Sequence, residues 1–143
     1  MSIMEALDVV ASGMSAQRVR MSVTSSNLAN ANTTRTEEGG PYRRRDPIFA
    51  AQTVGDKNDF MGLLNDEMQA VKVEGIQVSD GPLEKIFDPN HPDADENGYV
   101  SLPDVNVVEE MVNMVTASRS YEANATAFDL LRSMMQRALE IGG

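Results

Sequence analysis

The pattern of apolar residues over the first 34 residues predicts one long helix. From Ile3 to Leu28, positions that advance alternately by four and three residues are mostly apolar, which is typical of a narrow heptad stripe. Ser2 and Glu5 form a capping box at the start. The polar run from Asn30 to Thr34 ends the helix, because short polar side chains compete for backbone hydrogen bonds.

Residues 106–143 repeat this pattern and predict a second helix. Asn106 is a candidate N-cap, and Gly142 provides a stop. The apolar positions again advance by four and three residues as far as Phe128, after which the stripe slips by three to Leu131. A helix of about 35 residues measures about 50 Å, which is too long for a globule of this size.

Residues 35–105 are of a different kind, because they contain all six prolines and therefore no long helix. Extended segments are predicted at 48–54, 69–73 and 76–78, with a bend at Gly75. Turns are predicted at Asp80-Gly81 and Asn97-Gly98. The residues expected to form the core of this lobe are Phe49, Val71, Val73, Ile76 and Phe87.

The predicted fold is therefore α+β, with the chain organised as 1–34, 35–105 and 106–143. Two long terminal helices are expected to form coiled-coil packing within and between subunits, and to carry a small β-rich middle lobe. The few apolar residues of the first helix bury too little surface to offset the entropy of ordering its backbone. The helices therefore need companions from other molecules.

Composition narrows the possible functions. The net charge of −10 argues against a nucleic-acid binder, whose affinity depends on basic residues. The basic run Arg43–Arg45 is expected to be a solvated loop or a contact to an acidic neighbour. The N-terminus lacks the basic and apolar regions of a cleaved secretory signal, and the apolar runs are too short for a membrane helix.

The sequence offers few parts for catalysis. There is no cysteine, and His91 is the single histidine, so zinc and thiol chemistry have no ligands or nucleophile. No glycine-rich phosphate loop occurs, and neither an enzymatic activity nor a cofactor is expected. Asp93–Asp104 matches the spacing of a calcium loop, although Pro89 and Pro92 preclude the entering helix that an EF-hand needs. A calcium-dependent module and a cytoplasmic coiled-coil adaptor remain as alternatives.

Several motifs resemble one protein family. Ala11-Ser12-Gly13-Met14 and the Asn-Leu-Ala-Asn segment at 27–30 resemble the N-terminal signature of bacterial flagellar axial proteins. The segments 97–100, 103–111 and 119–124 look like the proximal rod proteins within that family. Asp104 departs from the asparagine that this family usually carries after Pro103.

This resemblance implies a structural subunit of the flagellar rod in the periplasm, exported through the flagellar type III apparatus. The implied partners are copies of the chain itself, other rod proteins and, during secretion, the export apparatus, with no nucleic acid and no small-molecule substrate. The terminal helices are expected to form an inner tube. The residues expected at the assembly interface are Leu7, Val10, Met14, Met21, Asn27, Leu28, Asn30, Asn32, Met111, Met114, Tyr121, Asn124, Phe128, Leu131 and Met135.

Overall fold

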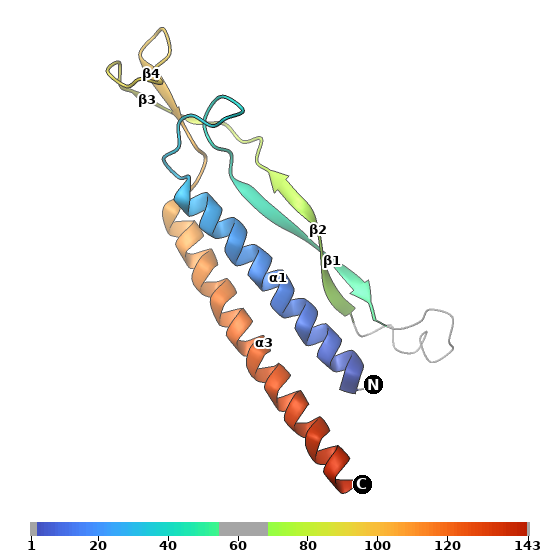
Figure 1. Cartoon of the computed structure of the whole chain (residues 1–143). Helices are drawn as coiled ribbons and strands as arrows, with labels where there is room; N and C mark the ends of the chain where they lie inside the picture. The colour runs from blue at the N-terminus through green and yellow to red at the C-terminus, as the bar shows by residue number, and fades with distance from the viewer. Residues whose placement is uncertain (1–2, 55–68, 143) are drawn as a thin grey trace. The chain divides into compact units, whose positions relative to one another are not determined.

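The computed structural model describes residues 3–54 and 69–142, which form an α+β fold of two helices and two small antiparallel sheets (Figure 1). Helix α1 opens the described chain and helix α3 closes it, while β1 pairs with β2 and β3 pairs with β4. The elements in chain order are α1 (Ile3–Ala29), β1 (Arg45–Thr53), β2 (Gln69–Val78), β3 (Glu84–Phe87), β4 (Tyr99–Leu102) and α3 (Val107–Ile141).

Both helices follow the predicted limits, and their ends have local causes. The Asn106 side-chain oxygen accepts hydrogen bonds from the backbone N–H groups of Val108 and Glu109, at 3.1 and 3.2 Å, so Asn106 is the N-cap of α3. Helix α3 ends at Ile141, directly before Gly142. The capping box at the start of α1 includes Ser2, which lies outside the described residues.

The strands differ from the prediction in two ways. Strand β2 continues through Gly75 without interruption, and β3 and β4 were not predicted at all. Each of these strands is only four residues long, which gives little pattern to detect, and the first two residues of β3 are charged. Their register pairs Phe87 with Tyr99, whose rings lie edge to face at 5.3 Å.

The predicted core of the middle lobe was wrong. Phe49, Val71, Ile76 and Phe87 are exposed, and Val73 is only half-buried. Each sheet has two strands, and these five positions are not covered by a second layer that would bury them. Within the described residues, the buried hydrophobic side chains are instead Ala16, Val23, Ala31, Tyr42, Val100 and Ala117.

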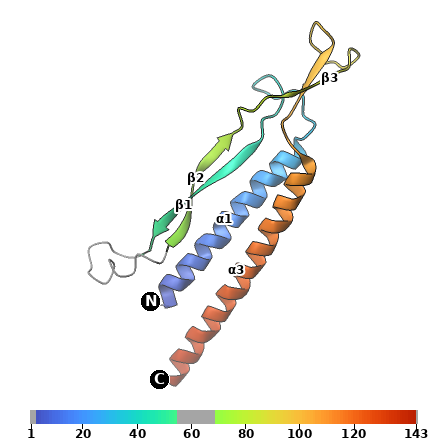
Figure 2. The ribbon, with the colours of Figure 1, turned by 180° about the vertical axis from the view of Figure 1, so that it is seen from behind.

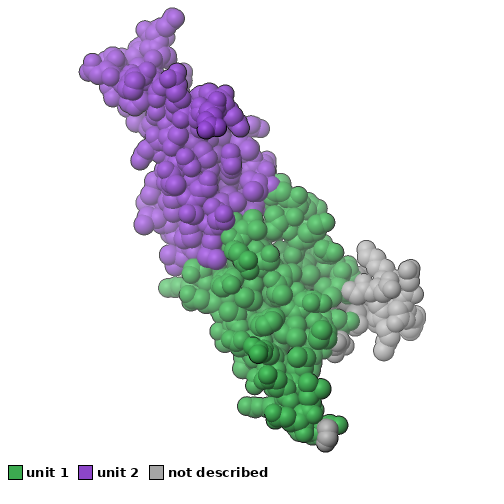
Figure 3. Space-filling view, in the orientation of Figure 1, with its two compact units in different colours: residues 1–19, 48–75, 116–143 green, residues 20–47, 76–115 purple. Residues whose placement is uncertain are grey.

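The chain divides into two compact units (Figure 3). Unit 1 takes its residues from 1–19, 48–75 and 116–143, and unit 2 is formed by 20–47 and 76–115. Each unit therefore contains part of both helices and part of the β1–β2 sheet.

In unit 1 the first part of α1 and the last part of α3 run side by side in opposite directions, as both ribbon views show (Figures 1 and 2). Gly13 faces Asn124, and a Cβ atom at Gly13 would stand 3.0 Å from the Asn124 amide nitrogen. The Ser12 hydroxyl donates to the Val9 carbonyl and accepts from the backbone N–H of Val71. Glycine thus allows the helices to approach closely, and one hydroxyl ties β2 to α1.

The close approach at Gly13 predicts a coupling between two side chains. In an ordinary helix interior, replacing glycine by alanine stabilises by about 1 kcal/mol. We expect Gly13→Ala to lose most of that gain, because the added methyl group crowds Asn124. In an Asn124→Ala background the gain should return. Urea unfolding followed by circular dichroism measures the double-mutant cycle, and equal effects of Gly13→Ala in both backgrounds would contradict the contact.

Candidate functional site

A buried polar cluster in unit 2 is built around Asn27, whose side chain is 1% exposed. Its amide nitrogen donates to the Arg45 carbonyl at 2.8 Å and to the Glu110 carboxylate at 3.1 Å. Its oxygen accepts from the Arg45 N–H at 3.0 Å and from the Tyr42 hydroxyl at 2.9 Å. Both donors and both lone pairs of the amide are therefore used, as burial requires.

Glu110 links this amide to a charge network. It is 2% exposed, and its second oxygen accepts from the Arg44 Nε at 2.9 Å. Arg44 also lies 3.2 Å from Asp46 and 3.5 Å from Glu109. Burial opposes the charge of Arg44, but Asp46, Glu110 and Glu109 outweigh it and raise the pKa of this guanidinium. The buried carboxylate thus has a permanently charged partner.

The three arginines of the basic run have three separate roles. Arg43 donates to the Gly81 carbonyl at 2.6 Å, and Arg44 pairs with Glu110. The Arg45 guanidinium stands 5.7 Å from the centre of the Tyr42 ring, within the range of a cation–π contact. The run is therefore a set of internal contacts in unit 2, one of them to acidic residues.

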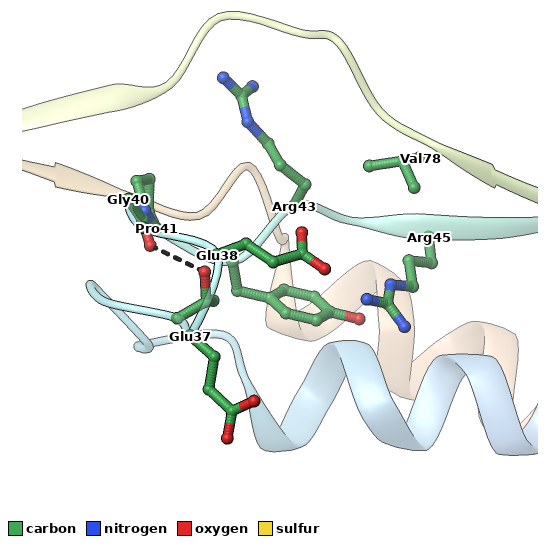
Figure 4. A pocket seen from close by; sticks show the side chains of 10 residues that line it. Glu37, Glu38, Gly40, Pro41, Arg43, Arg45 and Val78 are labelled. Atoms are coloured by element: carbon green, nitrogen blue, oxygen red, sulfur yellow. Dashed lines mark hydrogen bonds between the residues drawn. The ribbon is translucent and has the colours of Figure 1, made fainter.

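A cavity of about 490 Å³ borders this cluster and is lined by residues 36–43, Arg45 and Val78 (Figure 4). Arg43 and Arg45 line it but extend in different directions, and the negatively charged Glu37 and Glu38 also line it. A phosphate site needs donors that converge on one point. This cavity does not provide that arrangement.

Asp104 anchors the segment that leads into α3. Its carboxylate accepts hydrogen bonds from the Ser79 hydroxyl and from the Arg44 backbone N–H. Burial alone would raise the pKa of Asp104, but these hydrogen bonds outweigh it and lower the pKa. The folded state thus favours the ionised form of Asp104.

Two carboxylates of the candidate calcium loop, those of Asp93 and Asp95, have partners within the protein. Asp93 accepts from the Thr34 hydroxyl and lies 3.5 Å from the Arg35 guanidinium. Asp95 accepts from backbone N–H groups of its own turn, which lower its pKa. Across residues 3–54 and 69–142, no group of three or more acidic or histidine side chains is placed to hold a metal ion. The loop is thus a turn closed by its own hydrogen bonds.

The structure places the sequence-predicted interface residues on several surfaces. Asn27 is buried, whereas Asn32 and Met111 are exposed. Asn30 sits at the end of α1, where its amide donates to the Ser26 carbonyl. The remaining predicted residues are half-buried: Leu7, Val10, Met14, Met21, Leu28, Met114, Tyr121, Asn124, Phe128, Leu131 and Met135.

Sequence reasoning missed an exposed apolar face of α3. Leu130, Met134 and Ile141 in unit 1 are exposed, as are Val108 and Val115 in unit 2. These residues lie between the positions of the heptad stripe, so counting only that stripe passes over them. The helical spacing of Leu130, Met134 and Ile141 was the available signal for the apolar face in unit 1.

The cluster predicts that replacing Asn27 lowers the free energy of unfolding more than replacing Asn30, although both belong to the Asn-Leu-Ala-Asn motif. Asn27→Ala removes the side-chain partner of both backbone groups of Arg45 and the shorter of the two hydrogen bonds of the Tyr42 hydroxyl, which keeps a 3.4 Å contact with Ser26. Each buried group left unpaired costs about 1–3 kcal/mol. We expect a loss of about 3 kcal/mol or more in the free energy of unfolding. Asn30→Ala, at the partly exposed helix end, is the matched control and should cost about 1 kcal/mol or less. Urea titration measures both, and similar losses would contradict the role of the cluster.

The lowered pKa of Asp104 predicts part of the acid sensitivity. Its contribution to stability is fully present above the ordinary pKa of an aspartate and is lost as the pH falls through the lowered folded-state pKa. Between about pH 6 and about pH 3, the wild type should therefore lose more free energy of unfolding than Asp104→Asn. Asp80→Asn, at an exposed position, should follow the wild type. Parallel curves for wild type and Asp104→Asn would disprove the assignment.

Among the described residues, neither helix is long and apolar enough to cross a membrane. Two family models match the chain: "Flagella basal body rod protein" over residues 7–35 and "Flagellar basal body rod FlgEFG protein C-terminal" over residues 96–141. The first match covers most of α1 and Asn27, and the second covers α3 and Glu110. Both sides of the Asn27–Glu110 contact therefore fall in segments typical of rod proteins.

Full-length relatives agree with these matches. The chain is 44% identical to the flagellar basal-body rod protein FlgC of Borreliella burgdorferi, over 99% of this chain and 98% of the relative. It is 42% identical to FlgC of Bacillus subtilis, over 99% of both chains. For FlgC of Aquifex aeolicus the identity is 43%, over 98% of this chain and 97% of the relative. The chain belongs to the FlgC family of flagellar basal-body rod proteins.

Proposed function

We propose that this protein is a structural, non-catalytic subunit of the flagellar rod, which polymerises through its terminal helices into a drive shaft across the periplasm. The observation that carries this proposal is the similarity to FlgC proteins along the entire chain. The rod would transmit the torque of the motor, and the subunit would reach it through the flagellar type III apparatus. Its partners would be copies of itself and other rod proteins.

The exposed apolar residues of α3 support polymerisation through the helices. Met111 is 56% exposed, and Val108 and Val115 are exposed beside it in unit 2. Contiguous apolar surface of this kind marks interaction sites on soluble proteins. We propose that coiled-coil packing between subunits covers these residues, while α1 and α3 also pack within each subunit.

Stiffness of the shaft would follow from this packing. A rotating rod must resist torsion, and side chains packed to the density of a protein interior have low compressibility. Many lateral helix contacts distribute the load, whereas a single hinge would concentrate it. The buried cluster at Asn27 would keep the subunit itself from deforming, because its hydrogen bonds join α1, the segment before β1 and α3.

Complementation of a strain deleted for this gene tests the proposal. The deletion should abolish swimming and leave basal bodies without a complete rod, and the wild-type gene should restore both. In a strain without a functional flagellar export apparatus, the protein should accumulate in the cytoplasm. Motile deletion cells with complete rods would exclude the proposed function.

One substitution tests assembly apart from folding. Met111→Glu places a charge on the exposed face of α3, near the helix N-terminus, where negative charge is tolerated within the monomer. We expect an unfolding midpoint close to the wild type but loss of motility in the complementation strain. Gln77→Glu, at an exposed position of β2, is the control and should swim normally. Normal motility of Met111→Glu would argue against α3 as an assembly surface.

A further inference from the structure

The outer face of α3 in unit 1 is apolar and exposed. Leu130 is 61% exposed, Met134 59% and Ile141 87%. Their spacing places them on one face of the helix, largely opposite the side that carries the buried Ala117. Arg137 lies on the same line and is also exposed. This face combines large apolar side chains with one positive charge.

The outer face of α1 in unit 1 has the complementary character. Ala11 and Ser15 are exposed and small, so a second helix can approach there closely. Met4 and Asp8 continue the same line toward the N-terminus, and Arg18 continues it in the other direction. The line advances by four, three, four and three residues, and the outer face of α3 advances in the same way from Ile141 back to Ala127.

We propose that the outer face of α3 in one copy packs against the outer face of α1 in a second copy, with the two helices antiparallel. The matched spacing then allows five simultaneous pairs. Two of them join a large apolar side chain to a small one, one joins two large apolar side chains, one joins opposite charges, and one joins an alanine to an arginine. These pairs are Ile141 with Met4, Arg137 with Asp8, Met134 with Ala11, Leu130 with Ser15, and Ala127 with Arg18.

Charge selects this direction and register. A parallel arrangement with the same spacing would place Met134 on Ser15 but would bring Arg137 opposite Arg18. Like charges across an interface oppose association, whereas the antiparallel arrangement pairs Arg137 with Asp8. A shift of one heptad in the antiparallel arrangement would place Asp8 against Leu130 without a partner.

The contact cannot form within one chain. Inside the subunit Gly13 faces Asn124, so the two helices meet through other faces and in another register. The proposed register is displaced by eight residues from that one, or about 12 Å along the helix. The contact joins two different surfaces, the outer face of α3 and the outer face of α1. A pair of copies therefore still has one free outer face of α1 and one free outer face of α3. Such heterologous contacts give open helical assemblies or rings.

The inference rests on the proposed function and specifies the partner surface. Because the chain has no cysteine, engineered cysteines report the contact without background. Two differently tagged full-length variants, Ala11→Cys and Met134→Cys, are mixed as purified proteins and are also co-produced in cells of the deletion strain. Opposed positions allow the short Cβ separation that a disulfide needs, so we expect a mixed disulfide between the two tags.

The matched control replaces Met134→Cys by Gln136→Cys, which is exposed at a similar height but on another side of α3. We expect about tenfold less mixed disulfide from this pair, equivalent to about 1.4 kcal/mol. Asp8→Arg in the Ala11→Cys variant should lower cross-linking about tenfold as well. Adding Arg137→Asp to the Met134→Cys variant should restore it.

The outcomes separate the two levels of the proposal. Equal cross-linking of positions 134 and 136, or none in both preparations, overturns the register, while rod incorporation of the wild type would still support the proposed function. Failure of charge exchange to restore cross-linking removes the Asp8–Arg137 pair and therefore the direction. Absence of the wild-type protein from isolated basal bodies would remove the proposed function together with the contact.

Discussion

A buried amide must form all of its hydrogen bonds, and Asn27 meets this requirement only with groups that are far apart in the chain. Its amide bonds both the N–H and the carbonyl of Arg45, in the way that a paired strand would. The hydroxyl of Tyr42 and the carboxylate of Glu110 provide the two remaining hydrogen bonds. An arrangement that displaces any of these partners leaves a polar group unpaired inside unit 2. The cluster therefore fixes the end of α1, the start of β1 and the start of α3 together.

The faces through which the two helices meet inside the subunit differ from the faces proposed for assembly. In unit 1 the inner contact depends on small size, because Gly13 leaves room for Asn124, and in unit 2 it depends on the Asn27–Glu110 hydrogen bond. The exposed apolar residues of α3, such as Leu130 and Met134, take no part in these contacts. The outer faces of both helices therefore remain available for the proposed polymer.

The sequence patterns predicted the features of the structure that depend on neighbouring residues. Heptad spacing and the Asn106 cap predicted both helices to within a few residues, because each helix depends on its own sequence. The Asn27–Glu110 bond joins residues 83 positions apart, and no spacing rule connects them. The prediction of the core of the middle lobe was wrong because it took apolar strand residues to be buried. Phe87 and Ile76 are exposed in the structure. Apolar character predicts burial only where a second layer exists.

The net charge of the chain affects how readily copies would associate in solution. A net charge of −10 makes copies repel one another at a distance, although each carries exposed apolar faces. One heterologous helix contact must overcome this repulsion and the loss of freedom on association, so it is weak alone. Several contacts made at once raise the effective concentration of each remaining contact. On this basis we propose that a growing rod end, which would offer several neighbours together, holds a subunit more firmly than a single copy in solution does.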